Sequence, residues 1–214
     1  MKDLVVIGSG GHGREIIDTL STPSELARNT RVAEWNLLGV VDDDPTHTGP
    51  LDRLGVPLLG DIGWLIDHPT TFVVGIGTPG VRRHVVERLV GVGAQPAVVV
   101  HPGAHVGLDV ELGEGVVVFD RCTVTTDVRI GAHTHLNVGC AVQHDSVVGD
   151  YVQFSPGVFV NGDCHIGDGV FLGTGAIVTR GCRVGAGARV GAGAVVLHDV
   201  EPGATVVGVP ARPL

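Results

Sequence analysis

Residues 106–147 read VGLDVE LGEGVV VFDRCT VTTDVR IGAHTH LNVGCA VQHDSV, and each block of six begins with a bulky apolar residue. The same spacing continues without a slip to Val196. An α-helix cannot keep a six-residue spacing on one face, and plain strand alternation does not require every third inward residue to be the bulky one. The period predicts a solenoid of short strands and turns, in which three blocks make one three-sided coil.

The other positions of each block fit a narrow prism. The residue four places after each bulky one also points inward and is small or medium-sized, such as Val110, Cys122 and Ala176. Glycine often follows the bulky residue, where we expect a sharp corner without room for a side chain. One column of such corners contains Gly113, Gly131, Gly149, Gly167 and Gly185.

These repeats, together with the closing segment from Pro202-Gly203 to Leu214, resemble the hexapeptide-repeat acyltransferases. The resemblance implies a left-handed parallel β-helix over residues 98–214. The handedness comes from the family alone, because the period does not specify it and the general crossover rule favours the right hand.

The N-terminal part begins with a strand, a glycine turn and a helix. An apolar run at 4–7 precedes Gly8-Ser9-Gly10-Gly11-His12-Gly13, and residues 14–20 have helical spacing. Further strands are expected at 37–41 and 72–76, with helices around 62–66 and 81–89. Alternating strands and helices predict a parallel sheet, so residues 1–97 are interpreted as an α/β half-Rossmann domain (βαβαβ).

The glycine turn matches G-x-G-x-x-G, a pattern that lets a phosphate approach the backbone at the start of a helix. A full NAD domain is disfavoured, because only one mononucleotide-sized half is present and no hydride-transfer domain follows. A nucleotide attached to a sugar suits one half better. A purely structural role for the glycines in a tight turn stays open.

The glycine turn, the aspartates after residue 41 and the uninterrupted repeat together resemble the nucleotide-sugar acetyltransferases, including those acting on 4-amino-4,6-dideoxysugars and the sialic acid O-acetyltransferases. The resemblance implies acetyl-CoA as co-substrate and a homotrimer. It also implies that the nucleotide-linked sugar is contacted by Gly10, Gly11, His12, Gly13, Asp42 and Asp43. A solvated acidic cluster is the other interpretation of the aspartates.

His144 and Asp145 are the candidates for catalysis. They follow inward-facing Val142, so both side chains are expected outside, at a corner of the prism. Acetyl transfer to an amine needs a base, and a histidine oriented by a carboxylate provides one near neutral pH. The segment around them resembles the catalytic segment of the family, with Asn137 at a further active-site position. A solvated His-Asp pair is the alternative.

Three more residues are interpreted as contacts of acetyl-CoA. The backbone N–H of Gly162 is a candidate oxyanion donor, although an Asn161-Gly162 turn with positive φ explains the glycine equally well. Gln153 stands where relatives commonly carry a second histidine near the acetyl group, so it offers an amide but no titrating ring. Arg180, two coils beyond His144, is a candidate for coenzyme A phosphates.

Charge and composition narrow the possible partners. A formal net charge of −9 with a single lysine argues against nucleic acid. No apolar run approaches the length of a membrane span, and no signal peptide is evident, so a cytoplasmic protein is expected.

Metal is not expected, since His101, His105, His133, His135 and His165 lack the spacing of the zinc site in β-helical carbonic anhydrases. The four cysteines are interpreted as buried reduced thiols rather than disulfides or metal ligands.

The sequence therefore predicts an acetyl-CoA-dependent N-acetyltransferase acting on a nucleotide-linked 4-amino-4,6-dideoxysugar, with His144 as general base. Two alternatives stay open. One is a sialic-acid-type O-acetyltransferase, since the residues do not distinguish an amine from a hydroxyl acceptor. The other is a non-catalytic nucleotide-sugar-binding protein, motivated by Gln153.

Overall fold

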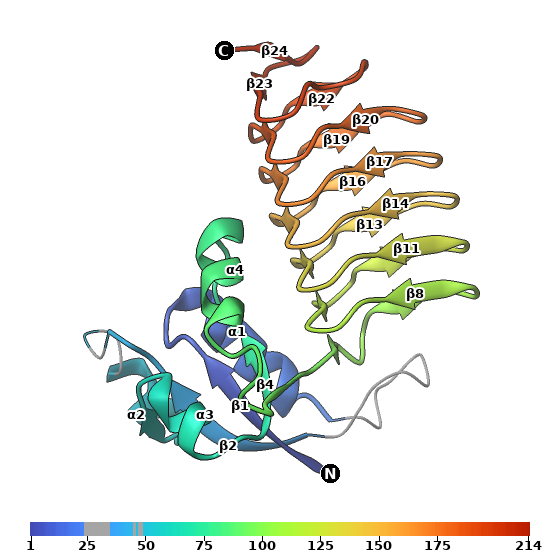
Figure 1. Ribbon diagram of the computed structural model, residues 1–214. Coiled ribbons are helices and arrows are strands. Elements are labelled where there is room, and N and C mark those ends of the chain that lie inside the picture. The colour runs from blue at the N-terminus through green and yellow to red at the C-terminus, as the bar shows by residue number, and fades with distance from the viewer. Residues whose placement is uncertain (24–34, 45, 47–48) are drawn as a thin grey trace.

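The structure is a computed structural model and describes residues 1–23, 35–44, 46 and 49–214. It has two parts (Figure 1). A small α/β domain at the N-terminus packs against the side of a long stack of short strands that runs to the C-terminus. We call residues 1–97 the nucleotide domain, after the ligand that the sequence leads us to expect there, and residues 98–214 the β-helix.

The nucleotide domain is built on a parallel sheet with the strand order β3-β2-β1-β4-β5. The order reverses at β1, which is the arrangement of a Rossmann-type sheet. Its strands are β1 (Lys2–Ile7), β2 (Trp35–Val41), β3 (Leu58–Gly60), β4 (Thr71–Val74) and β5 (Gln95–Pro96). The expected three-strand core is confirmed, and two short edge strands extend it.

Helices cover both faces of this sheet. They are α1 (Gly11–Ser21), α2 (Gly49–Leu54), α3 (Gly63–Asp67) and α4 (Pro79–Glu87). Leu4 and Val6 of β1 pack in the same apolar cluster as Ile16 of α1. Val5 and Ile7 pack in a second cluster with Leu65 of α3 and Val85 of α4. Because successive side chains of β1 point to opposite faces of the sheet, one face packs against α1 and the other against α3 and α4.

The apolar face of α4 differs from the expected one at its first turn. The sequence pattern places Val81 on that face, but its side chain is 48% exposed. Arg82 points inward instead and is completely buried, in line with Val85 and Leu89. These three residues share one helical face because they are spaced by three and four positions.

The β-helix has three faces, each a sheet of parallel strands stacked coil upon coil. Face 1 consists of β6 (Val99–Val100), β9 (Val117–Val118), β12 (His135–Leu136), β15 (Gln153–Phe154), β18 (Phe171–Leu172), β21 (Arg189–Val190), β23 (Thr205–Val207) and the antiparallel β24 (Arg212–Pro213). Face 2 consists of β7 (His105–Val106), β10 (Thr123–Val124), β13 (Ala141–Val142), β16 (Phe159–Val160), β19 (Ile177–Val178) and β22 (Val195–Val196). Face 3 consists of β8 (Val110–Leu112), β11 (Val128–Ile130), β14 (Val147–Val148), β17 (His165–Ile166) and β20 (Arg183–Val184).

Strand pairing confirms the predicted coil length. Thr123 pairs with Ala141, and Ala141 with Phe159, so each strand lies beside the strand three blocks later. The bulky residue of each block points into the prism; Val124, Val142 and Val160 have no exposed surface. The four cysteines are buried and free.

The corners of the β-helix have two distinct backbone features, which are crowded glycines and residues with positive φ. At Gly131 and Gly167 a Cβ atom would lie 2.5 Å from backbone atoms of the next coil, so the column predicted to lack side-chain room does lack it. The second feature was not predicted: every sixth residue from Asp109 to Gly193 has positive φ, and seven of these residues are not glycine. At Asn161-Gly162 the residue with positive φ is Asp163, with φ 60°. The turn explanation of Gly162 is therefore wrong.

The two parts share one apolar core. A continuous cluster of buried side chains runs from Leu4 and Ile17 of the nucleotide domain to Phe119 and Leu136 of the β-helix. Among the described residues, no helix has both the length and the apolar character needed to cross a membrane.

Candidate functional site

The three glycines of the G-x-G-x-x-G pattern after β1 have different roles. Gly8 has φ 107°, a backbone conformation that favours glycine. Gly13 packs so closely that a Cβ atom would overlap the carbonyl oxygen of Gly8, and a Cβ on Gly75 would lie 2.5 Å from Gly13 Cα. Gly10 has open space where a Cβ would point. Gly8 and Gly13 therefore shape the turn, while Gly10 leaves room for something to approach the start of α1.

A shallow pocket lies at that helix start. It is lined by Gly10, Gly11, Arg14, Thr46, Gly49 and Pro50. The N-cap residue of α1, Gly10, makes no side-chain capping hydrogen bond, so no cap side chain competes for the first N–H groups of the helix. Together with the positive end of the helix dipole and the Arg14 guanidinium, they make a site suited to phosphate.

Asp42 and Asp43, the first two of the three aspartates after β2, have different partners. Asp42 Oδ2 accepts hydrogen bonds from the backbone N (2.7 Å) and Oγ (2.6 Å) of Ser9. Asp43 forms an ion pair with Arg88 and accepts from the backbone N of Ile62 at 3.0 Å. The hydrogen bond from Arg88 lowers the pKa of Asp43. Asp42 therefore orders the glycine turn, and contact of either residue with base or ribose stays a prediction.

His144 and Asp145 lie in the turn between β13 and β14, where face 2 meets face 3. Their side chains are 45% and 55% exposed, as expected for an outer corner. His144 Nδ1 lies 2.7 Å from Asp145 Oδ2. Because an ionised carboxylate only accepts, Nδ1 carries the proton and Nε2 of the neutral ring is left with a lone pair. The hydrogen bond from His144 lowers the pKa of Asp145.

Gly162 lies one coil further along the same corner, directly beside the histidine. A Cβ atom at this position would lie 2.6 Å from His144 Cε1 and 2.7 Å from Nε2. A glycine is therefore required by the ring next to it. Within the described part of the chain, the N–H of Gly162 has no hydrogen-bond partner. Its predicted role as an oxyanion donor stays untested.

Arg180 belongs to the same column of turns, another coil along. Its side chain is exposed, and its positive charge contributes to the lowered pKa of Asp145. The corner thus brings together His144, Asp145, Gly162 and Arg180. We call these four residues the corner group.

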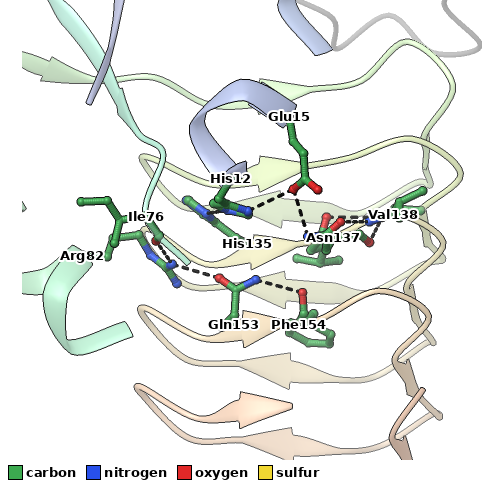
Figure 2. A network of polar contacts seen from close by, with 11 residues as sticks. His12, Glu15, Ile76, Arg82, His135, Asn137, Val138, Gln153 and Phe154 are labelled. Atoms are coloured by element: carbon green, nitrogen blue, oxygen red, sulfur yellow. Dashed lines mark hydrogen bonds and ion pairs between the residues drawn. The ribbon is translucent and has the colours of Figure 1, made fainter. Parts of the chain in front are cut away.

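His12 and Asn137 lie elsewhere, in the contact between the nucleotide domain and face 1 (Figure 2). His12 Nε2 is 2.9 Å from His135 Nδ1, and His12 Nδ1 is 3.3 Å from Glu15 Oε2. Asn137 Nδ2 donates to Glu15 Oε2 at 3.4 Å. The hydrogen bond from His12 lowers the pKa of Glu15. The Glu15 carboxylate thus reaches His12, which the sequence assigns to substrate binding, and Asn137, which it assigns to the active site.

Gln153 also lies in this contact and is only 4% exposed. Its Oε1 accepts from Arg82 Nη1 at 3.0 Å, and its Nε2 donates to Phe154 O at 3.0 Å. The amide is therefore held by the protein at both ends. Its predicted contact with acetyl-CoA stays a prediction. Sequence reasoning missed Arg82, although an arginine on the apolar face of α4 is a signal that could have revealed it.

Apart from the glycine turn and its aspartates, the predicted site residues form two groups on one chain. The corner group lies where faces 2 and 3 meet, which is the edge opposite face 1 in a three-sided prism. Asn137 and Gln153 lie on the face 1 side of the β-helix, beneath the nucleotide domain, and His12 of α1 contacts this surface from the other side. No contact between described residues joins the two groups.

The histidines weighed as zinc ligands are dispersed. His133 stacks on Tyr151 with ring centroids 5.1 Å apart, and His135 contacts His12. Burial lowers the pKa of His133 to about 4 and that of His135 well below its usual value. Among the described residues, no three metal-ligating side chains gather at one point.

Comparison with known proteins covers both parts. Residues 3–89 match the family model of the PglD N-terminal domain, and residues 163–198 match that of the bacterial transferase hexapeptide (six repeats). A curated relative is the UDP-N-acetylbacillosamine N-acetyltransferase of Bacillus subtilis, 33% identical over 122 residues. That alignment covers 55% of this chain and 51% of the relative, so the chain matches about half the length of this protein.

Solved structures match the chain over its whole length. PerB from Caulobacter crescentus, in complex with CoA and GDP-perosamine, is 30% identical with a TM-score of 0.86, covering 100% of this chain and 98% of that one. The acetyltransferase domain of PglB from Neisseria gonorrhoeae is 30% identical with a TM-score of 0.83, covering 100% of both chains. WeeI from Acinetobacter baumannii is 31% identical with a TM-score of 0.83, again covering 100% of both.

Proposed function

The chain belongs to the hexapeptide-repeat nucleotide-sugar N-acetyltransferases, and from that premise we propose that it transfers an acetyl group from acetyl-CoA to the amino group of a nucleotide-linked 4-amino-4,6-dideoxysugar. Similarity to PerB, whose structure contains CoA and GDP-perosamine, and to the UDP-N-acetylbacillosamine N-acetyltransferase supports both substrates. His144 is the proposed general base.

The observation that carries this proposal is the geometry of the corner group. Asp145 holds the Nδ1–H of His144, so the Nε2 lone pair is available at an exposed edge of the β-helix. Gly162 leaves the space beside that nitrogen unfilled. A base with a fixed tautomer and free space around its lone pair suits removal of a proton from an attacking amine.

The proposed reaction has two steps. The amine nitrogen attacks the thioester carbonyl carbon, a C–N bond forms, and one N–H proton passes to His144 Nε2. The resulting oxyanion receives a hydrogen bond from the N–H of Gly162. The carbon–sulfur bond then breaks, and His144 returns its proton to the departing sulfur, so that free coenzyme A thiol and the amide are the products.

The nucleotide domain is proposed to bind the nucleotide of the aminosugar that accepts the acetyl group. The open space at Gly10, the uncapped start of α1 and the Arg14 side chain support binding of the diphosphate there. Gly11, His12, Gly13, Asp42 and Asp43 are the further residues proposed to contact the nucleotide-linked sugar. Gln153, Gly162 and Arg180 are proposed to face acetyl-CoA.

A second protomer is proposed to complete the site. The corner group lies on the edge opposite the face that carries the nucleotide domain, so one chain does not bring its own base to its own glycine turn. A homotrimer, in which each corner meets the nucleotide domain of a neighbour, resolves this separation. Acetyl-CoA as co-substrate and four free buried cysteines support a cytoplasmic location.

The test of the activity is release of free thiol from acetyl-CoA. UDP-, dTDP- and GDP-linked 4-aminosugars are screened beside a sialic acid acceptor. Turnover with one aminosugar supports the proposal and identifies the nucleotide. Turnover with the sialic acid alone replaces it with O-acetylation, and nucleotide binding without any turnover replaces it with a binding protein.

The role of His144 is tested in the same assay. His144→Ala is expected to lower kcat by roughly 10²-fold or more, with nucleotide affinity unchanged. The matched control is His105→Ala, which removes another exposed histidine of the β-helix and is expected to leave kcat unchanged. An unchanged rate in His144→Ala would show that the base lies elsewhere. Mixing inactive His144→Ala with an inactive Gly10 variant is expected to restore activity if neighbours share sites.

A further inference from the structure

Arg82 joins the nucleotide domain to the β-helix through its guanidinium group. Its side chain leaves α4, has no exposed surface and ends against face 1 (Figure 2). Nη1 donates to Ile76 O of its own domain at 2.6 Å and to Gln153 Oε1 at 3.0 Å. Nε donates to His133 O at 2.8 Å. Nη2 donates to Val152 O at 3.1 Å and to Tyr151 O at 3.3 Å.

All of these acceptors are uncharged. Among the described residues Arg82 forms no ion pair, which is unusual for a buried cation. Burial lowers its pKa to about 9, so the group is still protonated at neutral pH. Burying an unpaired charge is costly, and an apolar side chain would fill the same space at lower cost. Unlike an apolar side chain, the planar guanidinium donates hydrogen bonds in fixed directions to several acceptors at once.

The acceptors include the amide of Gln153, whose orientation is thereby determined. With Oε1 held by Arg82, Nε2 is directed to Phe154 O. Two further acceptors, His133 O and Tyr151 O, belong to corner residues with φ of 54° and 56°. Arg82 therefore holds two successive coils of face 1 at a position next to Gln153.

The same side chain also holds the loop that supports the glycine turn. Ile76, which accepts from Nη1, lies between Gly75 and Gly77. Gly75 packs directly on Gly13, and a Cβ on Gly77 would lie 3.9 Å from Gln153 Oε1 and 4.0 Å from His12 Cγ. Arg82 is thus bonded both to the loop under the proposed nucleotide site and to the coil bearing Gln153.

We propose that Arg82 is a positioning residue for acetyl transfer: it fixes the nucleotide domain relative to face 1 and directs the Gln153 amide, so that the bound amine meets the acetyl group. The proposal rests on the proposed function. It does not make Arg82 a contact of either substrate. Arg82 acts through the carbonyl of Ile76, the two coils and Gln153.

The test compares Arg82→Met and Arg82→Lys with Arg83→Met. Arg83 is the matched control, since it is the next residue of α4 and lies over the Tyr151 ring at 4.7 Å. Arg82→Met is expected to lower kcat roughly 10²-fold, as for a displacement of about 1 Å at a reacting centre. The KM for the nucleotide sugar is expected to stay within about threefold, because Arg82 bonds none of the residues that line the proposed phosphate pocket. Arg82→Lys retains the charge and part of the bonding and should recover part of the rate, while Arg83→Met should match wild type.

A purely structural role predicts a different result. It would lower the melting temperature and the fraction of folded protein, but kcat per folded protomer would equal that of wild type, and this outcome would overturn the proposal. Arg82→Lys keeps the test usable if Arg82→Met does not fold. Because Arg82 acts through Gln153, Arg82→Met combined with Gln153→Met should be no slower than the slower single variant, and multiplied losses would contradict that link.

Failure of the proposed function is recognised separately. If wild type transfers acetyl to no acceptor, the activity is wrong whatever Arg82 does. Hydrogen exchange then decides whether Arg82 couples the two parts of the chain. The coupling is supported if amide exchange becomes faster in both residues 8–15 and residues 133–137 in Arg82→Met but not in Arg83→Met. It is overturned if exchange in Arg82→Met is identical to that of wild type.

Discussion

His12 Nε2 lies 2.9 Å from His135 Nδ1, so a residue of the glycine turn is hydrogen-bonded to a buried residue of the β-helix. Glu15 accepts from the Nδ1–H of His12, which leaves His12 Nε2 as the acceptor and His135 Nδ1–H as the donor when both rings are neutral. The turn proposed to bind nucleotide is therefore anchored on face 1.

Coupling between these two histidines is the first prediction. His135→Leu removes the buried donor and leaves His12 Nε2 without its partner, at an expected cost of about 1–3 kcal/mol in the free energy of unfolding. His12→Leu should also destabilise, and the double variant should be more stable than the sum of the two losses predicts. Urea unfolding of the four proteins measures this. Losses that add within about 0.5 kcal/mol would show that the contact contributes no coupling.

Stability should fall in mild acid because of His133. Burial, followed by the charge of Arg82, lowers its pKa in the folded protein to about 4, against the ordinary histidine value of 6.5. The unfolded chain therefore binds more protons below pH 6.5, so this stability is fully present above that pH and is lost as the pH falls from 6.5 to 4. The loss is about 3 kcal/mol from this group. Urea unfolding between pH 4.5 and 7.5 checks it, and His133→Asn should show a flatter dependence than wild type.

Substitution by alanine should lower stability at Gly13 and nucleotide affinity at Gly10. Gly13→Ala places a Cβ against the carbonyl oxygen of Gly8 and should destabilise the protein strongly, by roughly 3 kcal/mol or more. Gly10→Ala meets no atom within 4 Å and should leave the melting temperature unchanged while lowering nucleotide affinity at least tenfold. Thermal melting and calorimetric titration with a nucleoside diphosphate separate the two effects. Unchanged affinity in Gly10→Ala would place the phosphate site elsewhere.

Gly162→Ala is expected to act on activity through His144. The new Cβ would lie 2.6 Å from the ring, so the imidazole must rotate away, and kcat should fall at least tenfold with little change in melting temperature. The backbone at Gly162 does not require glycine, because its φ is not positive. In a His144→Ala background the added methyl group has room. There Gly162→Ala should have no further effect, and an equal loss in both backgrounds would point to the backbone N–H rather than the ring.

Prediction from sequence worked best where one local rule repeats. The inward bulky residues from Val106 to Val196, the coil length and the crowded corner at Gly131 follow from a six-residue period that each block satisfies by itself. The strand, glycine turn and helix around Gly8–Gly13 are equally local. The positive φ at Asp145 and Tyr151 was missed, because these residue types do not reveal a left-handed turn without the coil that imposes it.

The sequence by itself determined the solenoid, the parallel nucleotide domain and the residue types of the candidate site, because short-range periodicity and turn chemistry specify them. Only the tertiary structure decided which of these residues meet. Packing of the nucleotide domain on face 1 brings His12 to His135 and Arg82 to Gln153, across 123 and 71 positions of sequence. The same packing leaves His144 on the opposite edge. These long-range contacts depend on how the surfaces of the two domains dock, and a local sequence pattern does not specify that docking.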